Sequence, residues 1–241
     1  MGCIRGEEEL IMDFLDQLLF YPLEQLPFYL IALIIAFTVH EFSHAYFANK
    51  FGDPTAKLLG RVTLNPAVHF DFLGILLLLI AGFGWARPVP VNRENFSNPR
   101  RMSIIVAAVG PLSNLLLGIL GALIYAVLYQ TGMIPPVGLT KTDQAVHLFF
   151  NIFILLNFFL CLFNLVPLPP LDGYRILENA LPPRLSARIQ KFEQWSILFF
   201  LLIILLPVFQ DYTIKPLYDA AHALSSKFLD MFIMMTGGYR L

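Results

Sequence analysis

The fold is decided by residues 26–48, LPFYLIALIIAFTVHEFSHAYFA, an apolar run with the length of a membrane-spanning helix. Near its end the run carries three ionisable residues within five positions, His40, Glu41 and His44. An ionisable side chain inside a membrane costs about 2.5–3.5 kcal/mol or more. Packing alone does not explain three of them, so we expect this helix to carry a chemical site.

The composition of the whole chain extends this membrane interpretation. Of the 241 residues, 57% are hydrophobic and 14% are charged, which is more apolar surface than a soluble domain of this size can bury. Further apolar runs lie at 72–86, 102–129, 146–168, 193–209 and, more weakly, 216–236. We therefore predict an all-α polytopic membrane protein with about five or six transmembrane or re-entrant segments.

The chain is expected to form one membrane-embedded domain over residues 1–241. Its core spans about 28–180, and 193–241 adds C-terminal membrane segments, although the sequence leaves open whether 216–236 crosses the bilayer. The net charge is −1, and no basic face with interleaved aromatic residues is evident. We therefore expect no nucleic-acid partner, and the oligomeric state is left open.

Lysine and arginine are distributed unevenly between the two ends of the predicted spans. Of the fourteen up to Lys215, eleven fall at one end and three at the other, and the positive-inside rule places the first group in the cytosol. Arg61 and Arg87, on either side of the run 72–86, both belong to the cytosolic group. This run is also short for a crossing. We interpret it as a re-entrant or interfacial segment, which needs protein or a water-filled cavity to cover its backbone.

The run is followed by Arg87-Pro88-Val89-Pro90-Val91-Asn92. Proline has no backbone N–H, so Pro88 and Pro90 remove donors from one side of an extended chain, which is typical of an edge strand or loop. We expect a short β-hairpin-like loop near the cytosolic face. Pro88, Val89, Pro90 and Val91 are candidates for binding an unwound substrate segment by strand addition, and a plain linker is an equal alternative.

The histidines of the first run have the spacing of a metal site. An i, i+4 pair on a helix lets His40 and His44 reach one Zn²⁺, with Glu41 beside the water molecule that the metal would bind. A catalytic zinc site needs a third protein ligand and leaves the fourth position open. Asp172 is the carboxylate in a strongly apolar, turn-forming context, NLVPLPPLDG at 164–173, where prolines end a helix and Gly173 permits a tight turn. We therefore predict one Zn²⁺ per chain, bound by His40, His44 and Asp172.

Together these motifs resemble the site-2 protease family. The resemblance rests on His40-Glu41-Phe42-Ser43-His44, on Gly110-Pro111-Leu112-Ser113-Asn114, and on residues 164–173, which are similar to the family's N-x-x-P-x-P-x-x-D-G. Asn65-Pro66-Ala67-Val68-His69 and residues 88–92 look like those of the small prokaryotic branch, and the similarity covers roughly residues 30–180.

The resemblance implies an intramembrane zinc metalloprotease in the plasma membrane of a prokaryote, with its active site toward the cytosol. It implies zinc ligation by His40, His44 and Asp172, with Glu41 as the general base. The sequence has no room for the PDZ insert or the nucleotide-sensing domain of some relatives, so we expect substrate selection without them.

Two further residues are candidates for the same site. The amide of Asn114, within the apolar run 102–129, is a candidate oxyanion donor, and a hydrogen bond between spans is an equally weighted alternative. His69 is a candidate substrate-binding residue at the gate, a spare ligand, or a polar residue at the mouth of the cavity.

Two other classes of protein compete with the protease. A metal transporter or channel would explain the intramembrane ligands but assigns no role to Glu41. A catalytically idle membrane chaperone would bind helices in the same groove. We expect a transmembrane protein or peptide as substrate and the lipid bilayer as surroundings, in regulated intramembrane proteolysis, with the substrate and cleavage position left open.

Overall fold

The computed structural model describes residues 21–81, 84–135 and 140–237. Its helices are α2 (Leu26–Lys50), α3 (Thr55–Leu58), α4 (Phe72–Ala81), α5 (Pro99–Gln130), α6 (Lys141–Asn164), α7 (Asp172–Ala180), α8 (Pro183–Leu205), α9 (Pro207–Tyr212) and α10 (Ile214–Thr236), with 3-10 turns η1 (Pro66–Val68) and η2 (Arg93–Asn95). No strand is assigned within these residues, which confirms the all-α prediction. The β-hairpin-like loop is not confirmed, and the nearest feature is a single antiparallel bridge between Phe70 and Ala86.

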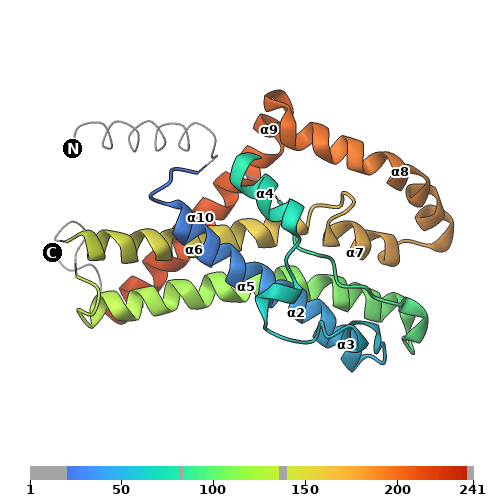
Figure 1. Cartoon of the computed structure of the whole chain (residues 1–241), viewed down its shortest axis with the longest axis horizontal. Coiled ribbons are helices and arrows are strands. Elements are labelled where there is room, and N and C mark those ends of the chain that lie inside the picture. Colours follow the sequence, from blue (N-terminus) through green and yellow to red (C-terminus); the bar gives the residue numbers. More distant parts are fainter. Residues whose placement is uncertain (1–20, 82–83, 136–139, 238–241) are drawn as a thin grey trace, which may run out of the picture.

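The core is a helical bundle. Helices α5 and α6 run side by side, and α2 and α10 each cross this pair obliquely and contact both helices (Figure 1). Ile154 and Phe158 of α6 are fully buried against α5 and α10. Small residues let the helices approach, since a Cβ at Gly121 would lie 2.9 Å from the Phe153 ring.

Three helices of the described residues, α2, α5 and α6, are long and apolar enough to cross a membrane. The apolar run 193–209 is divided between α8 and α9, because Pro207 begins a new helix. The run 216–236 lies in α10. The protein is therefore a membrane protein, whereas the count of five or six segments is not confirmed.

The start of α5 and the end of α6 follow local sequence signals. The side chain of Asn98 accepts a hydrogen bond from the Arg101 N–H, and Pro99 occupies the first turn of α5. Helix α6 ends at Asn164, before the proline-rich stretch, as predicted. These ends bring the start of α5 and the end of α6 to the side of the bundle where α7 lies (Figure 1).

The segment between His69 and Arg87 leaves the bundle and returns to the same point. The Phe70–Ala86 bridge joins its ends, and the Arg87 N–H donates to the His69 carbonyl at 2.7 Å. The returning chain lies against α4, where a Cβ at Gly74 would be 2.2 Å from the Trp85 carbonyl oxygen. The two ends therefore lie side by side, as the re-entrant interpretation requires.

Candidate metal centre

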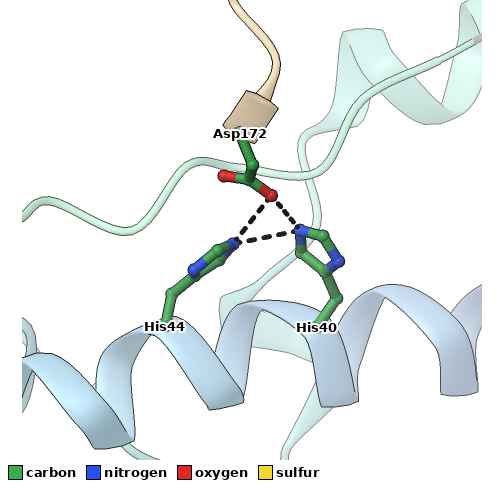
Figure 2. A group of neighbouring side chains, drawn as sticks. All are labelled: His40, His44 and Asp172. Carbon is green, nitrogen blue, oxygen red and sulfur yellow. Dashed lines mark hydrogen bonds and ion pairs between the residues drawn. The ribbon is translucent and has the colours of Figure 1, made fainter. Parts of the chain in front are cut away.

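His40, His44 and Asp172 meet at one point (Figure 2). The histidines lie on successive turns of α2, and Asp172 is the first residue of α7. The two histidine Nε2 atoms are 3.0 Å apart, and Asp172 Oδ2 lies 3.1 Å from that of His40 and 3.3 Å from that of His44. Ligand atoms at about 2.0–2.1 Å from a tetrahedral zinc ion are about 3.3–3.4 Å apart. The three atoms therefore have nearly the spacing that zinc requires.

Hydrogen bonds on the far side of the His44 ring direct its metal-binding nitrogen inward. His44 Nδ1 donates to the Val106 carbonyl at 2.6 Å, because a carbonyl oxygen can only accept. In the neutral ring, Nε2 then presents its lone pair toward His40 and Asp172. Asp172 Oδ2 is buried and receives no hydrogen bond. Two lone pairs and a carboxylate oxygen repel each other at these distances unless a cation or a proton lies between them.

The electrostatics of Asp172 agree with a cation-binding role. Burial alone would raise the pKa of Asp172, but the two imidazoles that contact its carboxylate, His44 and then His40, hold that pKa below its usual range. The carboxylate is therefore ionised, as a metal ligand must be.

A proline-rich turn delivers Asp172 to the histidines. After α6 ends at Asn164, the Leu171 N–H donates to the Leu168 carbonyl, and α7 begins at the next residue. Gly173 lies so close to the preceding chain that a Cβ there would be 2.2 Å from the Leu165 carbonyl oxygen. This turn, predicted from its prolines and glycine, fixes the position of the carboxylate.

Helix α5 covers the two histidine rings with a glycine. A Cβ at Gly110 would lie 2.3 Å from His44 Nε2 and 2.7 Å from His40 Nε2. Any side chain at this position would therefore press on both candidate ligand atoms. The glycine leaves room for the rings and for an ion between them.

The three ligands and Glu41 line a cleft of about 880 Å³. Glu41 follows His40 on α2, and its Oε2 accepts a hydrogen bond from the Val89 N–H at 3.2 Å. Pro88, Val89 and Val91 also line the cleft, so three of the four candidate substrate-binding residues of this loop share it with Glu41, the candidate general base. Arg93 and Arg175 contribute positive charge to the same cleft.

Asn114 lies behind His40, away from the cleft lining. Its Oδ1 is 2.7 Å from His40 Nδ1, and its Nδ2 donates to the Ala36 carbonyl and to Asn157 Oδ1. The hydrogen bond between spans is therefore present. A role as oxyanion donor would require one of the two donated bonds to break.

His69 is fully buried next to the Phe70–Ala86 bridge and is not among the described residues that line the cleft. Its Nε2 lies 2.8 Å from the Thr63 carbonyl oxygen. The structure therefore brings His40, Glu41, His44 and Asp172 together and leaves His69 outside this group.

Two buried charges, Arg61 and Asp53, to which the sequence analysis gave no role in the site, hold the loop with residues 88–91. Arg61 donates to the carbonyls of Val68, Arg87 and Pro88, and its bond to Pro88 is 3.1 Å long. Asp53 accepts from the Asn92 N–H at 2.7 Å and from Thr55 and Asn95. Both residues lie in hydrophilic connections, where charged side chains are common, so their sequence context carries no special signal.

The ionisation of Asp53 follows from these bonds. Burial alone would raise the pKa of Asp53, but hydrogen bonds from Thr55, Asn95 and Asn92 outweigh it and hold the pKa below its usual range. Asp53 is therefore a charged anchor at the working pH of the protein.

Comparison with known proteins agrees with this geometry. The sequence of residues 28–207 matches that of peptidase family M50. A Bacillus subtilis (strain 168) protein named "Putative zinc metalloprotease YwhC" is 45% identical over 86% of this chain and 92% of its own length. Proteins with the same description and the name Rip2 are 29% identical in Mycolicibacterium smegmatis and 28% in Mycobacterium tuberculosis H37Rv, over 77% of this chain and 69% of theirs. No solved structure matches significantly.

Proposed function

Because the chain belongs to peptidase family M50 and is an intramembrane zinc metalloprotease, we propose that it cuts membrane-spanning or membrane-proximal segments of other proteins on the cytosolic side of a prokaryotic plasma membrane. The observation that carries this proposal is the position of the site. His40, Glu41 and His44 lie on an apolar helix long enough to cross a membrane, and they line a cleft of about 880 Å³. Hydrolysis needs water, which such a cleft can admit.

The chain's own residues have separate tasks in the reaction. His40, His44 and Asp172 would hold the metal. When bound, zinc polarises the scissile carbonyl and makes water a nucleophile at neutral pH. Glu41 takes the proton of the attacking water and returns it to the leaving amine, because it is the carboxylate beside the ligands that the metal does not use. The Val89 N–H holds the Glu41 side chain at the cleft wall.

The hydrogen bonds of residues 88–92 favour strand addition over a plain linker. In an extended chain, alternate residues direct their backbone groups to the same edge. On one edge, Arg61 binds the Pro88 carbonyl, Pro90 has no N–H, and Asp53 binds the Asn92 N–H. The opposite edge, with the Val89 N–H, faces Glu41. An unwound substrate segment could pair with the backbone groups of that edge other than the Val89 N–H, and regain backbone bonds that it loses on leaving its helix.

The orientation rests on charge. Arg93 and Arg175 line the cleft, and both belong to the group of eleven lysines and arginines that gather at one end of the predicted spans. The positive-inside rule places that end in the cytosol. The cleft would therefore open toward the cytosol and receive substrates from the bilayer.

The proposal can be tested by mapping new protein termini in membranes that contain the wild type or Glu41→Gln. Glutamine keeps the shape of the side chain but cannot take a proton, so cleavage should fall by about 10²- to 10⁴-fold at equal zinc content. We expect new cytosol-proximal termini of membrane proteins with the wild type alone. Equal termini in both samples would contradict the proposal, and zinc flux into vesicles containing purified wild type would favour the transporter.

A further inference from the structure

Three buried polar side chains form a line from the middle of the bundle to the metal site. Asn157 lies on α6, Asn114 on α5 and His40 on α2, and both asparagines are fully buried. Asn157 Oδ1 is 3.1 Å from Asn114 Nδ2, and Asn114 Oδ1 is 2.7 Å from His40 Nδ1. The proteolytic mechanism gives Asn157 no task.

Backbone carbonyls at two points of this line fix the direction of every hydrogen bond in it. Asn157 lies 2.8 Å from the Phe153 carbonyl, which only accepts, so the NH₂ group of Asn157 must face that carbonyl and its Oδ1 must face Asn114. Asn114 must then turn its own NH₂ group toward Asn157, where it also meets the Ala36 carbonyl at 3.3 Å. A flipped Asn114 would set its oxygen against two acceptors.

The orientation of Asn114 determines which nitrogen of His40, a candidate metal ligand, carries the proton. Because its NH₂ group donates to Asn157 and Ala36, Asn114 presents Oδ1 to His40, and an amide oxygen only accepts. His40 Nδ1 must therefore carry the proton, and in the neutral ring Nε2 keeps the lone pair that faces His44 and Asp172. The opposite tautomer would set a protonated Nε2 in the place of the metal.

We propose that Asn157 is a positioning residue that fixes the tautomer of His40 through Asn114 and so prepares Nε2 for zinc. His44 does not depend on this line, because its Nδ1 donates directly to the Val106 carbonyl. The two ligands of one helix are thus oriented by different means. The proposal rests on the zinc site and not on the substrate, so its test needs no protease assay.

The test compares Asn157→Leu, which has a similar size and no polar group, with Asn157→Asp. A protonated aspartic acid at this buried position can donate to the Phe153 carbonyl and still accept from Asn114, so it should restore the line. Asn151→Leu is the matched control, because Asn151 is an exposed residue of the same helix. Two quantities are measured: the zinc dissociation constant, and the ¹⁵N spectrum of the metal-free protein at alkaline pH, with its five histidines labelled and assigned by single substitutions.

In the wild type we expect His40 to carry its proton on Nδ1. Asn157→Leu should mix the His40 tautomers, leave the His44 signals in place and weaken zinc binding by about 10- to 100-fold. Asn157→Asp and Asn151→Leu should resemble the wild type. A proton on Nε2 of His40 in the wild type would overturn the proposal even if Asn157→Leu failed to fold. An Asn157→Leu protein with wild-type tautomer and zinc affinity, or with equal changes at His40 and His44, would also overturn it.

Discussion

The two walls of the cleft are built in different ways. On the bundle side, neutral groups of α5 and α6 orient the ligands of α2, through Asn114 and the Val106 carbonyl. On the loop side, two buried charges, Arg61 and Asp53, hold residues 88–92. Neutral hydrogen bonds suit helices within a membrane, where a charged side chain is costly. Arg61 and Asp53 lie instead in hydrophilic connections between helices, where charged side chains are common. We therefore expect that metal binding and the proposed substrate presentation by residues 88–92 can be altered separately.

The largest effect is expected on the bundle side, from Gly110→Ala. The added methyl group would lie 2.3 Å from His44 Nε2 and 2.7 Å from His40 Nε2, so it must displace at least one ligand. We expect elemental analysis of the purified protein to find essentially no zinc, and cleavage to be lost with it.

The matched control is Gly118→Ala on the same helix, where the methyl group would meet only the Phe158 ring, at 3.3 Å. This variant should keep its zinc. Full zinc content in Gly110→Ala would show that the helices separate easily and that the close approach of α5 does not define the site.

On the loop side, Arg61→Gln should reduce activity without loss of zinc. A hydrogen bond from a charged donor contributes about 1.5–3 kcal/mol, so loss of the Arg61 hydrogen bond to the Pro88 carbonyl should lower kcat/KM by roughly tenfold or more. Arg101→Gln, which removes an exposed arginine of α5, is the control and should change little. Zinc loss in Arg61→Gln to the extent of its activity loss would remove the distinction between the two walls.

A smaller effect is expected from Asp53→Asn. The amide keeps the shape but replaces an ionised acceptor by a neutral one, at a cost of about 1 kcal/mol, or roughly fivefold in kcat/KM at neutral pH. Zinc content should again be unchanged.

The stability of Asp53→Asn relative to the wild type should also depend on pH, in a direction that the pKa of Asp53 determines. The pKa of Asp53 is lower in the folded protein than in the unfolded chain, so its contribution to stability is complete above the unfolded pKa and is lost as the pH falls through the folded pKa. Thermal unfolding in detergent should therefore show wild type and Asp53→Asn converging in acid. A stability difference that grows as the pH falls would contradict the assignment.

The meeting of His40, His44 and Asp172 could be predicted from the sequence because local signals position each of them. The i, i+4 spacing places His40 and His44 on one helical face, and the prolines and Gly173 position Asp172. That the ends of the segment between His69 and Arg87 lie side by side agrees with the sequence argument that Arg61 and Arg87 lie at the same end, whereas the re-entrant position in a membrane stays a prediction. The predicted runs 26–48 and 102–129 end within a few residues of α2 and α5, whereas α8 begins at Pro183, well before the predicted run 193–209.

What escaped prediction depends on packing between distant segments. Asn151 and Asn157 both interrupt the apolar sequence of α6, and only the contact with α5 distinguishes the exposed residue from the one that reaches Asn114. The break of the run 193–209 into α8 and α9 required giving weight to one proline, Pro207. Arg61 was counted for topology, but its three carbonyl partners come from chain segments that the fold brings together.

The most direct test of the zinc site is X-ray absorption at the zinc edge, measured on the wild type and on Asp172→Ala. We predict about one zinc ion per wild-type chain, bound by two imidazole nitrogens and a carboxylate oxygen at about 2.0–2.2 Å, with no sulfur. Asp172→Ala should lose most of its zinc. A sulfur ligand in the wild type, or an unchanged zinc content and coordination shell in Asp172→Ala, would contradict the site formed by His40, His44 and Asp172.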